Sequence, residues 1–298
     1  MEITVIPERL RKFEIPGRIT FATGSGGLPK INITTGRSTA EIYLHGAHVT
    51  GFQKNGEPPL LFMSRLSQFA AGKAIRGGVP VCFPWFGQRE GDVMHGFARI
   101  TKWELIESAA MPDGSVKVRF RLPVTAANAA WPPFRAEFAV TVADKLTMEL
   151  IATNESPDRN FEFEDCLHTY FAVGDILDVS IAGLKGAHYL DKTDKSARKL
   201  ETADAICITA ETNRVYPDTP GTVEIHDAKF RRTIRVEKNN SASTVVWNPW
   251  TTQLMPDFDP AEHRQMLCVE SGNVSENKIA LAPGATTVIK VVLSSHAA

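Results

Sequence analysis

Apolar and polar residues alternate at every second position over much of this chain. Between positions 116 and 122, for example, Val116, Val118 and Phe120 are separated by Lys117 and Arg119. This two-residue period is that of a β-strand with one buried face, because successive side chains of a strand point to opposite sides. The pattern predicts strands at residues 31–35, 40–44, 116–122, 138–142, 146–151, 161–171, 223–226, 233–236, 243–247, 266–270 and 287–293.

Helical periodicity is nearly missing from the chain. Only residues 261–266 and the region around Ala203 indicate short helices, and no segment sustains a 3.6-residue period. The sequence therefore predicts an all-β fold, most simply a large antiparallel β-sandwich of two packed sheets. A β-propeller remains an alternative topology, although no fixed-period repeat stands out.

The chain shows no internal boundary. No Pro-, Gly- or Ser-rich stretch divides it, so residues 1–298 are predicted to form a single domain. The segment 191–199, rich in charged and small residues, is expected to be a solvated loop within that domain. A length of 298 residues with 43% hydrophobic content is enough for a sizeable core.

The predicted strand 161–171 has two chemically different faces. Glu162, Glu164, Cys166, His168 and Tyr170 share one face, whereas the other is mainly phenylalanine and leucine. Carboxylates, an imidazole and a phenol on one face are typical of a lined cleft. The alternative is a strand with a solvated outer face and an ordinary histidine.

Residues 73–87 fit neither a helix nor a regular strand, because Gly77, Gly78, Pro80 and Pro84 interrupt them. Within this loop Arg76 precedes Gly77 and Gly78, so a guanidinium together with backbone N–H groups could bind an anion. The alternative is a structural loop with an ordinary surface arginine. Further on, His95 and Arg99 flank Gly96 in a pattern that suits a polar ligand. No nucleotide-binding glycine motif is found.

Glu270 lies in an otherwise apolar strand end, residues 266–274. Such a carboxylate is exposed by the pleat, partnered, or functional with a raised pKa. A positioned carboxylate and a positioned imidazole suit proton transfer between two oxygens of one small substrate. Hydrolytic glycosidases usually need two flanking carboxylates. No serine-hydrolase elbow or clustered histidine motif is present, so neither a serine nucleophile nor a metal site is predicted.

Net charge and cysteine content restrict the expected partners and cellular location of the protein. A net charge of −1 offers no general attraction to nucleic acid or an anionic membrane. Segment 1–17 is interrupted by charges and prolines, so neither a signal peptide nor a membrane span is expected. The four cysteines form no C-x-x-C pair, which favours reduced, mostly buried thiols and a cytoplasmic location. A structural disulfide remains the alternative.

Four motifs in order resemble one known family. They are I-R-G-G-V-P-V-C-F-P-W-F-G at 75–87, H-G-F-A-R at 95–99, W-N-P-W at 247–250 and C-V-E-S-G-N at 268–273. Together they are similar to the hexose-6-phosphate mutarotases, the glucose-6-phosphate 1-epimerases of the galactose mutarotase-like superfamily. The resemblance covers about residues 40–295.

The resemblance implies a single-domain β-supersandwich whose concave face binds a phosphorylated aldohexose without metal or cofactor. By resemblance, His168 is the acid that protonates the ring oxygen, and Glu270 is the base that takes the proton of the anomeric hydroxyl. Arg76 and Arg99 would contact the substrate and favour its phosphate, and His95 would contact sugar hydroxyls. The implied reaction interconverts the α and β anomers of a hexose 6-phosphate, with glucose 6-phosphate expected. A monomer is expected, although the sequence leaves the oligomeric state open.

Two positions depart from the family pattern. Asn213 precedes Arg-Val-Tyr where an aspartate usually binds sugar hydroxyls, and Met94 precedes His95 where relatives often carry a polar residue. An asparagine still accepts hydrogen bonds but offers no charge. Two alternatives stay open: a non-catalytic carbohydrate-binding protein on this fold, and an epimerase of unphosphorylated aldoses. The presence of both His168 and Glu270 argues against the first, since binding alone needs neither proton donor nor acceptor.

Overall fold

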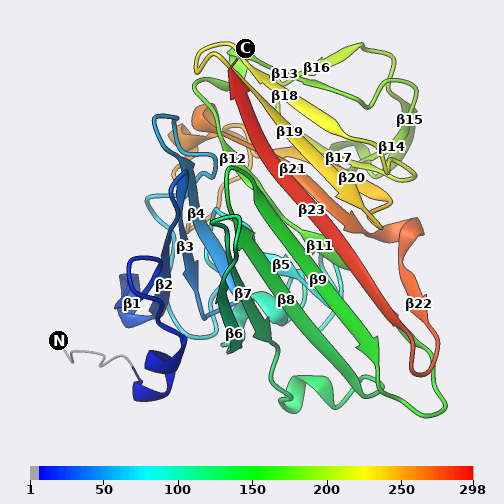
Figure 1. Ribbon diagram of the computed structural model, residues 1–298. Coiled ribbons are helices and arrows are strands. Elements are labelled where there is room, and N and C mark those ends of the chain that lie inside the picture. The colour runs from blue at the N-terminus through cyan, green and yellow to red at the C-terminus, as the bar shows by residue number, and fades with distance from the viewer. Residues whose placement is uncertain (1–6, 298) are drawn as a thin grey trace.

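Two large antiparallel sheets form the body of the molecule, whose computed structural model describes residues 7–297. Figure 1 shows the sheet that carries the long β23 lying in front of the second sheet. The nine strands of the first sheet are, in spatial order, β16 (Ala205–Cys207), β13 (Val179–Ala182), β18 (Val223–Asp227), β19 (Arg232–Asn239), β23 (Thr286–Ala297), β9 (Leu146–Asn154), β8 (Phe134–Val142), β7 (Val116–Arg121) and β6 (Glu104–Ala110).

The second large sheet carries most of the motif residues. Its strands are, in spatial order, β15 (Ala197–Leu200), β14 (His188–Asp191), β17 (Thr212–Tyr216), β20 (Ser243–Asn248), β21 (Met266–Asn273), β11 (Asp165–Leu167) and β5 (Val81–Cys82), and β12 (Tyr170–Ala172) also pairs with β21. Two smaller sheets comprise β1 (Ile19–Thr23), β2 (Pro29–Thr34), β3 (Ser38–Tyr43) and β4 (His48–Lys54), and then β10 (Phe161–Phe163) with β22 (Ile279–Leu281).

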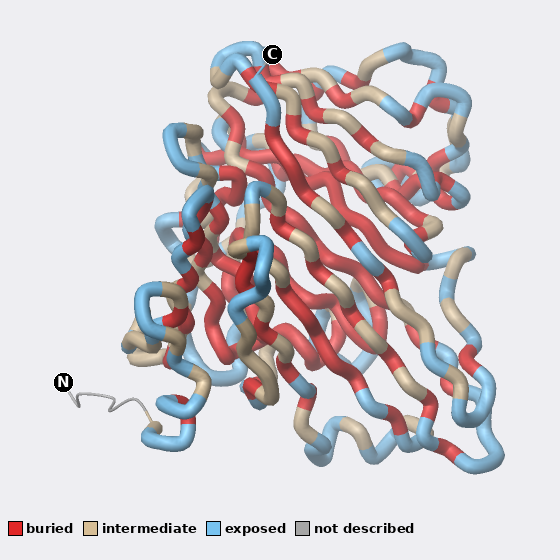
Figure 2. Tube along the Cα trace, in the orientation of Figure 1, coloured by how far each residue is buried: buried red, intermediate tan, exposed pale blue. Residues whose placement is uncertain are grey.

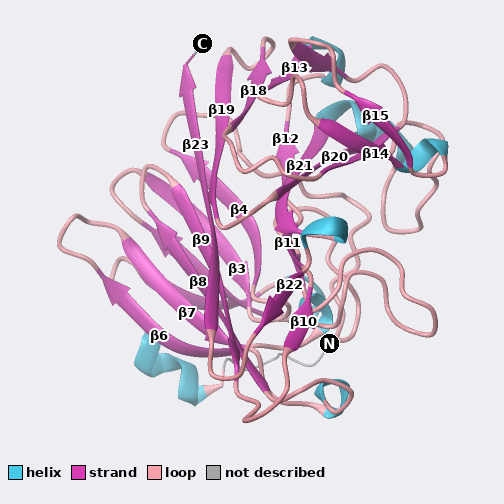
Figure 3. Ribbon diagram, turned by 90° about the vertical axis from the view of Figure 1, so that its right-hand side faces the viewer, coloured by secondary structure: helices cyan, strands magenta, loops and turns pink. Residues whose placement is uncertain are grey.

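Helices are short and peripheral (Figure 3). All that the structure describes are of the 3-10 type: η1 (Glu8–Phe13), η2 (Ser25–Gly27), η3 (Ala98–Ile100), η4 (Ala126–Asn128), η5 (Ile176–Asp178), η6 (Lys192–Asp194), η7 (Pro260–Gln265) and η8 (Ser275–Asn277). In residues 7–297 no helix has the length and apolarity needed to cross a bilayer. Residues 1–6, the first part of the segment in which no signal peptide was expected, lie outside the described residues.

The core lies between the two large sheets, as the period-2 pattern predicts. Along β9, buried and half-buried residues alternate, and Leu146, Met148 and Leu150 point inward. They belong to the same hydrophobic cluster as Leu267 and Val269 of β21. Buried segments accordingly run through the centre of both sheets in Figure 2. The predicted all-β antiparallel sandwich is thus confirmed, and the propeller alternative is wrong.

Strand β21 is buried along its whole length. Leu267 and Val269 face the core, and the side chains of Cys268 and Glu270 therefore point to the opposite, concave face. There an aromatic cluster that includes Tyr170, Trp247 and Phe258 packs around Cys268 and covers this end of the strand. The sheet thus holds a carboxylate on a face that is not core and yet is shielded from water.

The single strand predicted at 161–171 is wrong. The segment forms β10, β11 and β12 in succession, because β10 leaves to pair with β22 while the other two pair with β21. At the two breaks between these strands the backbone bonds to the irregular loop 73–87. The N–H of Glu164 donates to the carbonyl of Pro84, and the N–H of His168 donates to the carbonyl of Pro80. Glu162 consequently lies exposed beside Lys278, away from the concave face.

Three smaller predictions have mixed outcomes. The helix at 261–266 is confirmed as η7, which Asp259 begins by accepting from the N–H of Ala261. No helix forms around Ala203, which lies in irregular chain before β16. Segment 191–199 is partly a hairpin rather than only a loop, since β14 pairs with β15. All four cysteines are free, and Cys207 is the exposed one, so the disulfide alternative is wrong.

Candidate active site

A pocket of about 580 Å³ opens on the concave face of the second sheet. Five of the six residues predicted for the site line it: Arg76, His95, His168, Asn213 and Glu270. They come from three segments outside the strands and from two strands, β17 and β21. Strand register explains part of this convergence, since Val245 of β20 faces Glu270 of β21, and Trp247 faces both Asn213 of β17 and Cys268.

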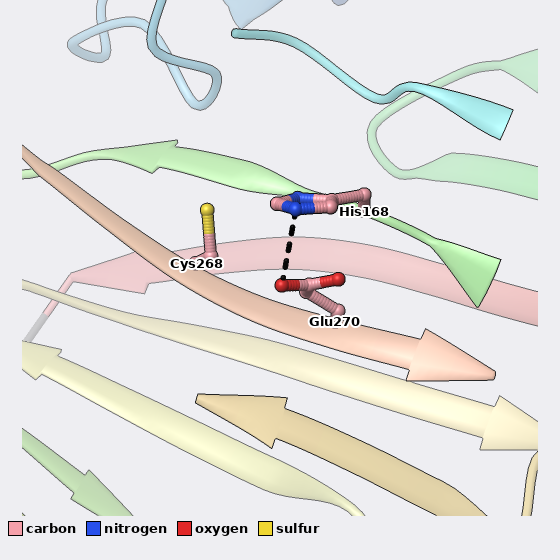
Figure 4. Close-up of side chains that lie close together, drawn as sticks. All are labelled: His168, Cys268 and Glu270. Carbon is pink, nitrogen blue, oxygen red and sulfur yellow. Dashed lines mark ion pairs between the residues drawn. The ribbon is translucent and has the colours of Figure 1, made fainter. Parts of the chain in front are cut away.

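His168 and Glu270 meet at the floor of this pocket. The Nε2 atom of His168 lies 3.4 Å from Oε1 of Glu270, and both side chains are buried, with 8% and 1% of their surface exposed. Figure 4 shows the imidazole directly above the carboxylate. The sequence could not show that these residues meet, because about a hundred positions separate them. The two side chains are therefore in direct contact.

Burial shifts the two pKa values in opposite directions. Desolvation raises the pKa of Glu270 well above its usual 4.5, against the opposing effects of the Cys166 thiol and the Arg99 charge. Desolvation also lowers the pKa of His168 well below 6.5, helped by His95, Arg99 and Arg76. Both shifts disfavour the charged form, as burial does for any ionisable group. The carboxyl therefore keeps its proton to a higher pH, and the imidazole loses its proton at a lower pH, than either group does in water.

Aromatic rings fix the plane of the His168 imidazole. Tyr170 stacks on it with centroids 4.8 Å apart and an interplanar angle of 11°, and the Trp247 ring meets it edge-on at 6.0 Å. Within the described part of the chain, the buried Nδ1 atom has no hydrogen-bond partner. Packing rather than hydrogen bonding thus orients this ring, and its Nε2 lies above the Glu270 carboxylate.

His95 stands edge-on to His168, with ring centroids 5.3 Å apart. The backbone N–H of Gly87 donates to its Nδ1 at 3.0 Å. Because a backbone amide can only donate, Nδ1 must be the unprotonated nitrogen. Burial lowers the pKa of His95 well below 6.5, so the ring is neutral and carries its proton on Nε2. His95 can therefore offer an N–H donor to a sugar oxygen.

Arg76 reaches the pocket already paired. Its guanidinium donates to both carboxylate oxygens of Asp257 at 3.2 Å and to the Tyr170 hydroxyl at 3.0 Å. Tyr170 is the residue that stacks on His168, so Arg76 lies on the His168 side of the pocket. The backbone N–H groups beside Arg76 were predicted to bind an anion together with its guanidinium. The N–H of Gly78 is not free for this, because it donates to the carbonyl of Phe62.

Arg99 is the predicted residue that does not line the pocket. Its side chain is buried, and Nη2 donates to the carbonyl of Met94 at 2.7 Å. From there its charge lowers the pKa values of both Glu270 and His168. Arg99 thus acts on the pair electrostatically in the structure, and its direct contact with substrate stays a prediction.

Several lining residues were not identified as site residues from the sequence. Lys192 lies in η6, inside a segment expected only to be a solvated loop, and Gln253 follows the W-N-P-W motif. Glu164 accepts from the N–H groups of Phe86 at 3.0 Å and Ser275 at 2.6 Å, so it ties two loops at the pocket wall. No residue pattern in the sequence distinguishes Lys192 or Gln253 from ordinary loop residues.

The arrangement matches one family of known proteins. The family model for aldose 1-epimerase matches residues 29–294. A protein of Cenchrus ciliaris named "Putative glucose-6-phosphate 1-epimerase" is 35% identical over 281 residues, 90% of this chain and 85% of that protein. A protein of the same name from Escherichia coli K12 is 33% identical over 247 residues, 80% of this chain and 81% of its own.

Solved structures agree with the sequence relatives. The crystal structure described as "a putative mutarotase" from Salmonella typhimurium superimposes with a TM-score of 0.87 at 27% identity, covering 96% of each chain. The galactose mutarotase related enzyme from Lactobacillus acidophilus shares the fold at 15% identity, with a TM-score of 0.70 over 90% of this chain and 97% of that one. The family match covers most of the chain, over a range that contains the positions of the buried pair, and we conclude that this protein is an epimerase of the aldose 1-epimerase family.

Proposed function

We propose that this enzyme interconverts the α and β anomers of a hexose 6-phosphate, with glucose 6-phosphate as the expected substrate. The observation that carries the proposal is the buried contact between His168 and Glu270 in a sugar-sized pocket. The names of the relatives from Cenchrus ciliaris and Escherichia coli support the choice of glucose 6-phosphate. The family membership leaves the non-catalytic alternative without support.

The chemistry needs one acid and one base that exchange roles. Glu270 takes the proton of the anomeric hydroxyl while His168 gives a proton to the ring oxygen, so the C1–O5 bond breaks and C1 becomes an aldehyde. Rotation about C1–C2 presents the other face of the aldehyde. Closure returns a proton from Glu270 to O1, and His168 takes the proton from the attacking O5 hydroxyl. The pair ends with the single proton it began with, so no outside proton is required.

The resting position of the shared proton differs from its position at ring opening. Burial favours the neutral imidazole and the protonated carboxyl, whereas the reaction starts with the proton on His168. Transfer across the 3.4 Å from Oε1 to Nε2 supplies that state. Substrate hydroxyls that donate to Glu270 favour the ionised carboxylate and hence the transfer. The Arg99 charge stabilises the carboxylate but opposes protonation of His168.

Mutation of the pair tests the mechanism. We expect His168→Asn and Glu270→Gln each to slow catalysed anomer exchange by about 10²–10⁴-fold, the usual loss when a general acid or base is removed. Saturation-transfer NMR on glucose 6-phosphate measures the exchange directly, with the enzyme-free rate subtracted. A variant that exchanges anomers at the wild-type rate would remove its residue from the mechanism.

The phosphate is proposed to lie on the Arg76 side of the pocket. His168 serves the ring oxygen, whose neighbour C5 carries the phosphorylated C6, and Arg76 contacts Tyr170 beneath His168. Lys192 is a second cation that lines the pocket. It follows β14, which β17 and β20 separate from β21 in the sheet. The predicted contact of Arg99 with the phosphate remains part of the proposal.

Substrate comparison tests this placement. Arg76→Ala should lower kcat/KM for glucose 6-phosphate about 10–100-fold, the loss expected for hydrogen bonds to a charged group, and should affect free glucose far less. Lys192→Ala is the matched control and should retain the preference for phosphate. An equal loss on both sugars would contradict the Arg76 assignment, and a loss of preference only in Lys192→Ala would reverse the orientation. A wild-type enzyme that prefers free glucose would favour the unphosphorylated alternative.

A further inference from the structure

Cys268 lies beside the His168–Glu270 pair, and the proposed mechanism does not use it. One potential ligand atom from each of the three residues lies within 4.8 Å of the other two, and all three residues are buried. Figure 4 shows the sulfur and the carboxylate on the same side of β21, with the imidazole facing both. A thiol, an imidazole and a carboxylate are thus gathered at one point.

The fold explains this gathering. Cys268 and Glu270 are two residues apart on one strand, so their side chains share the concave face. Tyr170 of β12 pairs directly with Cys268, and His168 lies two residues before Tyr170, with its ring stacked on the tyrosine. Strand pairing therefore holds the imidazole over the same stretch of β21 that presents the sulfur and the carboxylate.

These three groups suit a thiophilic divalent cation. Zinc takes thiolate, imidazole and carboxylate ligands, and sites with three protein ligands leave a fourth position open. With bond lengths of about 2.0–2.3 Å, neighbouring ligand atoms of a tetrahedral zinc lie about 3.3–3.7 Å apart. The His168–Glu270 distance of 3.4 Å already satisfies this, and because all three ligand atoms lie within 4.8 Å of one another, the widest separation must close by at most about 1.5 Å. The pocket lined by His168 and Glu270 provides the entry path.

We propose that His168, Cys268 and Glu270 form a binding site for a thiophilic divalent cation such as Zn²⁺, and that the bound cation blocks epimerisation. The cation would occupy Nε2 of His168 and a carboxylate oxygen of Glu270, the atoms that exchange the proton. Binding displaces the shared proton and the thiol proton into solvent, and the resulting thiolate and carboxylate balance the cation's two positive charges. The ionised ligands also offset repulsion from Arg76 and Arg99.

Cobalt spectroscopy tests the site without reference to activity. Co²⁺ added to the full-length protein should give the thiolate-to-metal charge-transfer absorption of a cobalt–cysteine bond, and Zn²⁺ should remove it by competition. Cys268→Ala should lack the absorption, whereas Cys207→Ala, which removes the exposed thiol, should retain it. If Cys268→Ala does not fold, as judged by circular dichroism, Cys268→Ser replaces it. An absorption that persists without Cys268, or that depends on Cys207, would overturn the proposal.

Inhibition supplies the second measurement. Zn²⁺ should slow anomer exchange by the wild type and by Cys207→Ala, and at least about tenfold more Zn²⁺ should be needed for Cys268→Ala, since one of three ligands is lost. Without metal, Cys268→Ala should exchange anomers like the wild type. Equal sensitivity of both variants would refute the inhibitory role. Because the cobalt absorption needs no turnover, a failure of the metal site is distinguishable from an error in the proposed substrate.

Discussion

The burial of His168 and Glu270 in direct contact sets the chemistry at the scale of individual residues. In water an imidazole and a carboxylic acid titrate near pH 6.5 and 4.5 and carry opposite charges between those values. Here desolvation moves the imidazole pKa down and the carboxyl pKa up, so burial favours the neutral form of each group. His168 therefore gains its proton only below its ordinary pH range, and Glu270 keeps its proton above its ordinary range.

The lowered pKa of His168 predicts that the rate of anomer exchange is level over a broad pH range. The exchange rate at saturating substrate should stay level as the pH falls through 6.5, where an ordinary histidine would gain a proton, and should drop only at lower pH. Saturating substrate is needed because a sugar phosphate itself titrates at about pH 6 and would change kcat/KM. NMR exchange measured at fixed ionic strength from about pH 5 to about pH 9 checks this, with free glucose as the control sugar. An acid limb centred near 6.5 would contradict the buried, neutral His168.

At the scale of elements, the spacing of β11 and β21 controls where His168 stands. Gly272 of β21 faces Cys166 of β11, and a Cβ atom there would come within 2.3 Å of the Asp165 carbonyl oxygen and 2.8 Å of the Cys166 Cα. Backbone cannot yield as a flexible side chain can, so any side chain at this position must push the strands apart. His168 follows β11 directly, so the displacement would reach the pair.

Gly272→Ala should therefore affect both stability and catalysis. We expect it to lower the free energy of unfolding by about 1–3 kcal/mol, as overpacking does, and to slow anomer exchange because Nε2 moves relative to Glu270. Urea unfolding and NMR exchange measure the two effects. The control is Gly221→Ala, since a Cβ at Gly221 meets nothing within 4 Å. Wild-type values of both quantities in Gly272→Ala would show that the strands can separate without cost.

At the scale of the whole molecule, one hydrophobic cluster joins elements from both ends of the chain. It contains Leu10 near the N-terminus and Leu293 of β23. Strand β23 lies in the interior of the nine-stranded sheet, between β19 and β9, so the last described strand pairs with elements formed much earlier in the sequence. Neither half of that sheet has a complete set of partners without the other.

A single domain should unfold as one unit. We expect far-UV circular dichroism and tryptophan fluorescence to report the same urea transition, because the two large sheets share one core. Trp103 and Trp247 report from different parts of that structure, one in the main cluster and one in the aromatic cluster at the pocket. Two separated transitions would contradict the single domain predicted for residues 1–298.

The alternation of apolar and polar residues predicted the fold class, and short motifs predicted the chemical groups of the site. Period-2 alternation identifies strands such as 146–151 because a strand between core and solvent must alternate, and the motifs around Arg76, His95 and Glu270 mark residues that line the pocket. The same pattern failed at 161–171, where apolar residues continue through two breaks. Backbone pairing with β21, β22 and the loop 73–87 sets those breaks, and no side-chain pattern encodes a partner's position.

Tertiary structure alone decided what surrounds each group. The sequence determined which chemical groups are available: the His168 imidazole, the Glu270 carboxylate, and the side chains of Arg76, His95 and Arg99. These are properties of residue type. The contact of His168 with Glu270 and the approach of Cys268 follow from strand pairing across long sequence separations. The pairing of Arg76 with Asp257 joins two loops, and Arg99 donates to the nearby carbonyl of Met94 and does not line the pocket. Burial is likewise a property of the assembled sheets, and it is burial that moves the pKa values on which the proposed reaction depends.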